Sequence, residues 1–127
     1  MVDVSQGRLR GVFIIESFRP DAALPNLDIA VDAITRIRPA SPGPEQPGIW
    51  TLVEFEAADA AAERLAATFA AALQPGPSYV DFHTADTTFV VFAGRVFRYA
   101  PGDAEARSLA VAHGREVGVS EDQLDWT

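Results

Sequence analysis

The sequence predicts an α+β fold, in which a mainly antiparallel sheet of about six strands carries two helices packed on one face. Three observations lead to this prediction. Short segments rich in β-branched and aromatic residues recur along the chain, two alanine-rich segments space their apolar residues as a helix does, and tight turns connect the later strands. The predicted order is βββα-βββα, which suggests an internal duplication, although no residues of the two halves align convincingly.

The length and composition indicate a single globular domain covering residues 1–127. Hydrophobic residues make up 48% and charged residues 22%, which is typical of a chain that can bury a core. Cysteine is absent, which excludes disulfides, thiolate metal sites and cysteine nucleophiles. Lysine is absent as well, which excludes Schiff-base catalysis by lysine and the phosphate-binding lysine of a P-loop.

Three strands and a helix are predicted in the first half. Residues 9–17 form the first strand, and residues 27–39 form the second, in which a bulge near Ala33 and Ile34 accounts for a break in the alternation. A helix is the alternative for that second segment. Residues 39–48 hold four prolines and form a loop, and residues 49–57 form the third strand.

A helix then begins at Asp59, which suits an N-terminal cap, and ends before Pro75. Its predicted buried stripe consists of Ala62, Leu65, Ala66, Phe69 and Leu73.

The second half predicts a three-stranded meander over residues 79–84, 87–92 and 95–99, with tight turns at residues 85–86 and 93–94. A second helix runs from the region of Asp103 to the stop at Gly118, and a capping-box pattern at residues 120–123 predicts a short helical turn. The predicted buried stripe of this helix is Ala106, Leu109, Ala110 and Val117.

The tight turns fix the register of the meander and therefore its two faces. One face is almost wholly apolar and is expected to lie under both helices: Val80, Phe82, Phe89, Val91, Val96 and Arg98. The other face mixes aromatic, charged and aliphatic residues: Tyr79, Asp81, His83, Thr88, Val90, Phe92, Arg95, Phe97 and Tyr99. A mixed face of this kind can serve as a ligand surface or a partner patch, and we expect Tyr79, Arg95, Phe97 and Tyr99 to do the binding.

His83 and Asp81 are the candidates for catalysis, because an aspartate two residues away on a strand can orient an imidazole that acts as a general base. An exposed surface pair is the interpretation we favour. Asp86 belongs to the turn between the strands. His113 is expected at the border of the second helix, near the helix end, and no metal site is expected because these two histidines lie in no ligand motif.

Glu54 and Glu56 share one strand face and could act as a glycosidase pair, but solvated carboxylates are the simpler interpretation. No glycine-rich phosphate loop, nucleophile elbow or other catalytic motif occurs, so no cofactor is expected and an enzymatic function stays open.

The net charge of -8 disfavours binding to nucleic acid and suits a basic protein surface or a small ligand as partner. No segment has the length and apolarity of a membrane span or a signal peptide, so a cytoplasmic protein is expected. We therefore expect a non-catalytic binding or protein-interaction module, with the His83 enzyme as the alternative. Self-association through an edge strand is open, since the sequence does not show which strand lies at the edge.

Overall fold

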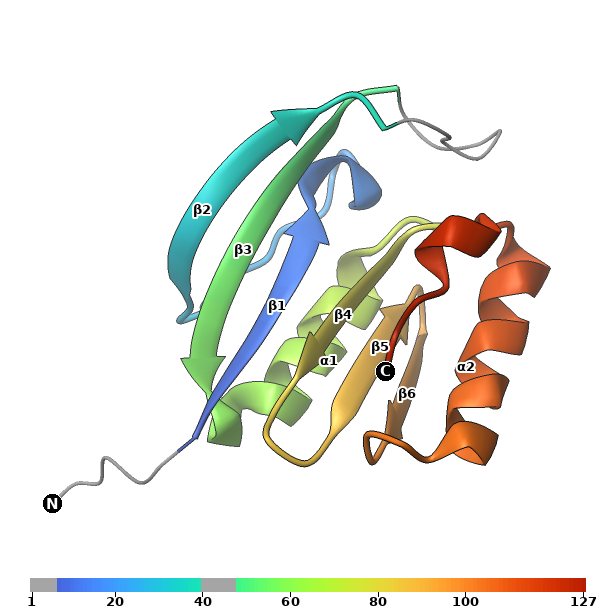
Figure 1. The fold of residues 1–127 in the computed structure, drawn as a ribbon. Helices are drawn as coiled ribbons and strands as arrows, with labels where there is room; N and C mark the ends of the chain where they lie inside the picture. Colours follow the sequence, from blue (N-terminus) through green and yellow to red (C-terminus); the bar gives the residue numbers. More distant parts are fainter. Residues whose placement is uncertain (1–6, 40–47) are drawn as a thin grey trace, which may run out of the picture.

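The computed structural model describes residues 7–39 and 48–127, and in them the chain forms a six-stranded antiparallel sheet with the order β2-β3-β1-β4-β5-β6 (Figure 1). The strands are β1 Arg8–Ile14, β2 Ala30–Ile37, β3 Trp50–Ala58, β4 Tyr79–His83, β5 Thr88–Phe92 and β6 Arg95–Tyr99. The helices are α1 Ala62–Ala72 and α2 Ala104–Val117, and the short 3₁₀ turns are η1 Ile15–Ser17, η2 Asp59–Ala61 and η3 Glu121–Gln123. The α+β class and the order βββα-βββα are confirmed, while residues 40–47 of the loop predicted at 39–48 lie outside the described residues.

β1 lies at the centre of the sheet, where it pairs with β3 on one side and β4 on the other. Gly11 makes the second pairing close, because a Cβ at this position would lie 2.7 Å from the carbonyl oxygen of Asp81 and would also collide with Phe82. The strand that comes first in the chain thereby joins the β2-β3 hairpin to the β4-β5-β6 meander.

The predicted bulge is present in β2. Val31 pairs with Phe55 and Ala33 with Glu54, which leaves Asp32 as the extra residue. Because one extra residue reverses the alternation, the side chain of Asp32 turns to the same side of the sheet as Glu54 and Glu56.

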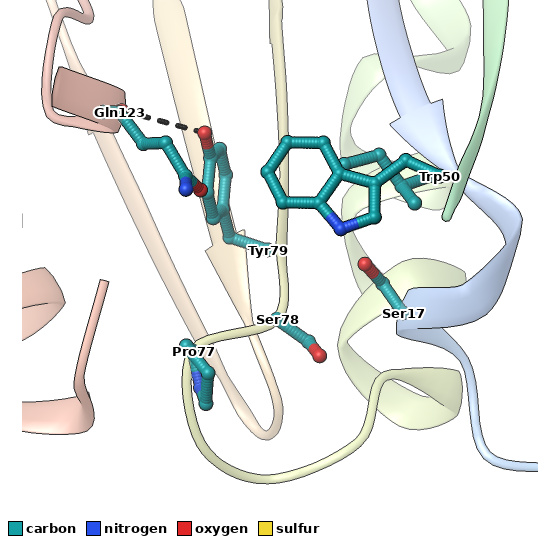
Figure 2. A pocket seen from close by; sticks show the side chains of 7 residues that line it. Ser17, Trp50, Pro77, Ser78, Tyr79 and Gln123 are labelled. Carbon is teal, nitrogen blue, oxygen red and sulfur yellow. Dashed lines mark hydrogen bonds between the residues drawn. The ribbon is translucent and has the colours of Figure 1, made fainter. Parts of the chain in front are cut away.

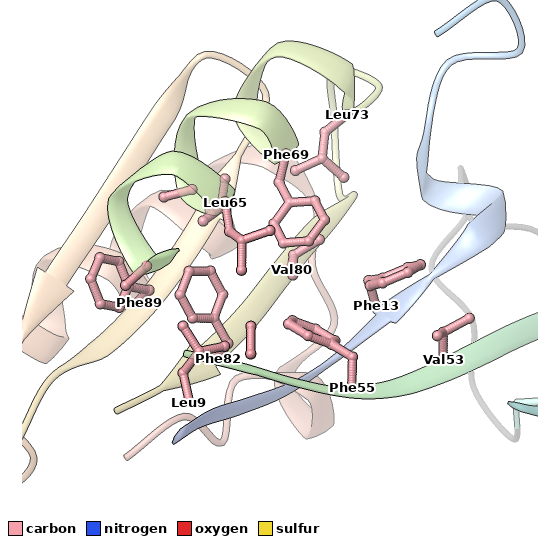
Figure 3. Close-up of a cluster of buried hydrophobic side chains, with 14 residues drawn as sticks. Leu9, Phe13, Val53, Phe55, Leu65, Phe69, Leu73, Val80, Phe82 and Phe89 are labelled. Carbon is pink, nitrogen blue, oxygen red and sulfur yellow. The ribbon is translucent and has the colours of Figure 1, made fainter. Parts of the chain in front are cut away.

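The larger apolar cluster lies between α1 and the sheet (Figure 3). Every residue of the predicted α1 stripe is buried, and the ring of Phe69 packs against Phe55 and Phe82 at centroid distances of 5.9 and 6.2 Å. Asp59, however, is not a cap: a 3₁₀ turn precedes α1, and no side chain caps the helix.

The second helix does not share this face. Ala110 and Val111 of α2 pack with Val90 and Phe92, whereas Val91, which points the other way, packs with the α1 cluster. The prediction of both helices on one face is therefore wrong, and the two helices lie on opposite sides of the β4-β5-β6 part of the sheet (Figure 1). The physical reason is β5, which is apolar from Phe89 to Phe92 and buried along its whole length, so that both of its sides must be covered.

The predicted stripe of α2 is wrong at one position, because Leu109 is 63% exposed. Ala110 is buried as predicted, and Ala106 and Val117 are partly buried against the same cluster. Val111 and Gly114 complete the buried side of the helix. Gly114 leaves room for the C-terminal segment, because a Cβ there would lie 2.7 Å from Leu124. The predicted ends are confirmed: Asp103 accepts a hydrogen bond from the Ala106 backbone N–H, and Gly118 has the left-handed φ of 99°.

After the predicted turn η3, the C-terminal segment, residues 124–127, returns over the α2 side of the sheet (Figure 1). The Trp126 ring packs against Tyr79 and Phe92 at centroid distances of 5.1 and 6.0 Å. Arg107 of α2 holds the segment, since its Nε donates to the Trp126 carbonyl and its Nη2 donates to the Leu124 carbonyl at 3.0 Å.

Candidate functional site

The meander has the predicted register. Tyr79 pairs with Phe92, Asp81 with Val90 and His83 with Thr88, and the pairing of β5 with β6 continues these rows to Arg95, Phe97 and Tyr99. The predicted binding residues therefore do share a face, which is the face that α2 and the C-terminal segment cover.

This cover buries Tyr99 of the predicted partner patch and half-buries Tyr79 and Phe97. Tyr99 is 5% exposed, Phe97 packs its ring against His113 and Phe92, and Tyr79 lies under Trp126 and donates a hydrogen bond to the Gln123 carbonyl at 3.3 Å. Arg95 stays exposed, with its guanidinium carbon 4.8 Å from the centre of the Phe97 ring. The expectation of an open aromatic patch is thus not met at these positions, and their binding role stays a prediction.

His83 and Asp81 lie on the same side of β4 but in different surroundings. His83 is exposed at the end of the strand, between Arg10 of β1 and Thr88 of β5. No hydrogen bond or ion pair joins the two side chains in the part of the chain that the structure describes.

Asp81 is the more perturbed of the two groups. Burial, with a contribution from the neighbouring Asp125 carboxylate, raises the pKa of Asp81 to about 6. Burial also raises the pKa of Tyr79, and the nearby carboxylates of Asp81 and Asp125 raise it further. A carboxyl group that titrates near neutrality is thus present beside the C-terminal segment, and only its position in the folded sheet reveals it.

Asp86 has the turn role predicted for it: its Oδ1 accepts hydrogen bonds from the hydroxyls of Thr84 and Thr87 at 3.1 and 3.2 Å. His113 packs against the sheet, with its ring centre 4.6 Å from that of Phe92. Burial, and to a smaller extent the nearby Arg95, lowers the pKa of His113. The neutral imidazole is therefore favoured over the protonated form, which is the form that would interact with the dipole at the helix end.

The other half of the sheet has a face that no described helix covers. On the side where α2 and the C-terminal segment lie over β4-β5-β6, no helix of the described chain lies over β1 and β3 (Figure 1). We call this surface the open face and define it by Arg10, Val12, Ile14, Leu52, Glu54 and Glu56. Val12, Ile14 and Leu52 are half-buried, so the surface has an apolar floor.

Carboxylates surround this floor. Glu56 lies 3.5 Å from Arg8 and 3.8 Å from Arg10, whereas Glu54 has no ion pair among the described residues. The bulge adds Asp32, whose pKa is raised by desolvation and then by its neighbour Glu56. The interpretation of Glu54 and Glu56 as surface carboxylates agrees with this placement.

One row across the open face brings two of these acids to the same apolar residue. Val12 pairs with Glu54 on β3 and with Asp81 on β4, so the two carboxylates flank it from both sides. Neighbouring strands lie about 4.8 Å apart, which separates the Cα atoms of the two acids by roughly 10 Å. Sequence reasoning could not find this row, because no local signal places β1 between β3 and β4.

The enclosed pocket at the edge of this face is too small for a ligand. Ile14, Ser17, Trp50, Pro77, Ser78, Tyr79 and Gln123 line it (Figure 2). Its volume of about 10 Å³ has room for one water molecule at most, and neither Asp81 nor His83 lines it.

Comparisons with protein-family models, curated proteins and solved structures find no match. Within residues 7–39 and 48–127, no cluster of three or more histidine and carboxylate side chains is arranged to hold a metal ion. No helix in these ranges is long and apolar enough to cross a bilayer.

Proposed function

We propose that the protein is a non-catalytic binding domain whose open face receives a cationic side chain of a basic protein partner. The observation that carries this proposal is the row in which Glu54 and Asp81 flank Val12. A guanidinium lying on Val12 would have one carboxylate on each side, and its aliphatic stem would lie along Ile14 and Leu52. The net charge of -8 would attract such a partner before contact.

The alternative, a small enzyme with His83 as general base oriented by Asp81, has less support. The two side chains share no hydrogen bond in the described structure, and His83 stands exposed at a strand end. General-base chemistry needs the base within hydrogen-bond reach of its substrate proton and, usually, a group that orients it.

The proposal is tested with a fluorescein-labelled peptide of alternating arginine and leucine, whose binding is measured by fluorescence anisotropy at pH 7.5. Glu54→Gln and Asp81→Asn should each weaken binding at least about fivefold, because each removes one of the flanking charges. Glu105→Gln is the matched control: it removes the same charge from an exposed position in the first turn of α2 and should leave the affinity nearly unchanged.

The pH dependence separates this site from general attraction to an acidic protein. Affinity should fall as the pH drops through about 6, where Asp81 takes up a proton, and Asp81→Asn should lose that dependence while Glu54→Gln keeps it. Equal weakening by Glu54→Gln and Glu105→Gln would show that only net charge matters and would overturn the proposal.

A further inference from the structure

β2 is an edge strand, and it carries an unusual share of exposed apolar side chains. Its outer side pairs with no strand among the described residues. Ile34 is 63% exposed, and Val31, Ile37 and the nearby Ile49 are also exposed large hydrophobic residues. An eight-residue edge with free backbone groups and apolar side chains is a template for pairing with another strand.

The charges along β2 are arranged with opposite signs on the two sides of Ile34. Asp28 and Asp32 precede it, and Arg36 and Arg38 follow it. A second copy of the same strand running antiparallel about Ile34 would therefore place its basic end beside the acidic end of the first. A parallel arrangement would instead place acid beside acid and arginine beside arginine, which is destabilising.

We infer that two copies of this chain associate through antiparallel pairing of their β2 strands, centred on Ile34, into one continuous sheet. The two Ile34 side chains meet at the twofold axis on the α1 side of the sheet. Thr35 lies opposite Ala33 of the second copy and, because the bulge residue Asp32 is not counted in the register, Ile37 lies opposite Ala30. The two residues of each pair lie on the same face of the continuous sheet. The contact is the same patch on both copies, as a closed twofold dimer requires.

The bulge affects how the charges meet. Asp32 turns toward Glu56 on the open face, whereas the Nε of Arg36 donates to Thr51 Oγ1 at 3.3 Å on the other face. The attraction between Asp32 and Arg36 of the second copy therefore acts across the edge of the sheet and not as a bidentate ion pair. It selects the direction and register of pairing, while backbone hydrogen bonds and Ile34 supply the contact itself.

Charged residues and bulges on edge strands commonly prevent pairing. In β2, the aspartates before Ile34 and the arginines after it disfavour parallel or shifted pairing but favour antiparallel pairing centred on Ile34. The other edge, β6, is shorter, packs against α2 and has no exposed large hydrophobic side chain. β2 is therefore the edge that fits a second copy.

Sedimentation velocity over a wide range of protein concentration tests the inference. The wild-type chain should shift from monomer to dimer as the concentration rises, and Ile34→Lys should raise the dimer dissociation constant at least about tenfold. Leu109→Lys is the matched control, because Leu109 is equally exposed at 63% but lies on α2, and this variant should dimerise like wild type. A wild-type chain that stays monomeric throughout, or equal effects of the two variants, overturns the inference.

Charge reversal provides a second test that does not depend on the apolar contact. Asp32→Arg and Arg36→Asp should each weaken the dimer, because each places like charges together across the edge. The double variant Asp32→Arg/Arg36→Asp should recover most of the lost affinity, with circular dichroism confirming that all three variants are folded. Absence of recovery in the folded double variant would contradict the proposed register.

Discussion

The indole of Trp126 packs edge-on against the ring of Tyr79, with the centroids 5.1 Å apart and the planes at 79°. This contact joins the C-terminal segment to the middle of the sheet. Trp126→Ala should lower the free energy of unfolding by about 2–4 kcal/mol in urea titrations, because a large buried ring and an aromatic pair are lost. Thr127→Ala, at the exposed neighbouring position, should change it by less than about 0.5 kcal/mol. A Trp126 variant as stable as wild type would mean that the segment does not support the fold.

Arg107 should be needed to hold the C-terminal segment in place. Lysine at this position carries the same charge but cannot donate to both the Leu124 and Trp126 carbonyls in the same geometry. Arg107→Lys should lower the free energy of unfolding by about 1–2 kcal/mol and speed amide hydrogen exchange in residues 124–127. Arg115→Lys, on the same helix but in an exposed ion pair with Glu121, should leave both measurements nearly unchanged. Equal exchange rates in the two variants would count against the anchoring role.

Asp81 should make the protein less stable as the pH rises. The folded-state pKa is raised from 3.8 to about 6, so the folded chain holds this proton more tightly than the unfolded chain does. The resulting stabilisation is complete below about pH 4 and is lost as the pH rises through about 6. Asp81→Asn should therefore gain roughly 1–3 kcal/mol over wild type between pH 4 and pH 7.

The difference in unfolding free energy between Asp81→Asn and wild type, measured in urea across this range, checks the prediction. Asp125→Asn should reduce the pH dependence only partly, because burial is the larger cause of the shift. A difference that stays constant with pH would show that Asp81 titrates normally.

Gly11 should tolerate no side chain. Alanine at this position would press against the Asp81 carbonyl and Phe82, so Gly11→Ala should cost about 1–3 kcal/mol of stability and weaken the β1-β4 pairing. Gly48→Ala is the control, since no atom lies within 4 Å of a Cβ placed there, and its cost should stay below about 0.5 kcal/mol. Thermal unfolding of the two variants distinguishes the predictions, and equal melting temperatures would contradict the close approach.

The parts of the fold that local chemistry determines could be read from the sequence. The two-residue turns predict the meander register, which the pairing of Asp81 with Val90 confirms, and the break in alternation predicts the bulge that the structure locates at Asp32. The α1 stripe followed from its spacing alone. These features depend on residues close together in the chain.

The parts that failed depend on contacts between distant segments. Leu109 fits a helical stripe as well as Val111 does, but Val111 is the one that joins the buried cluster with Leu124 and Trp126, which lie outside the helix. α2 lies on the side of β5 that α1 leaves uncovered, because both sides of this strand are buried. The apolar run at residues 89–92 already indicated that need in the sequence. The row of Glu54, Val12 and Asp81 needed the position of β1, which no neighbouring residue specifies.

The two ladders of β1 are unequal, and this has a consequence for how the molecule opens. Its pairing with β3 runs along the whole strand from Arg8 to Ile14, whereas its pairing with β4 covers only Arg10 to Val12. The β1-β4 pairing is therefore the one at which we expect the sheet to separate first during local unfolding. Glu54 and Asp81 lie on opposite sides of this β1-β4 pairing. A cation bound to both carboxylates would therefore hold the two parts of the sheet together, and a bound open face would lower the rate of local opening across the sheet.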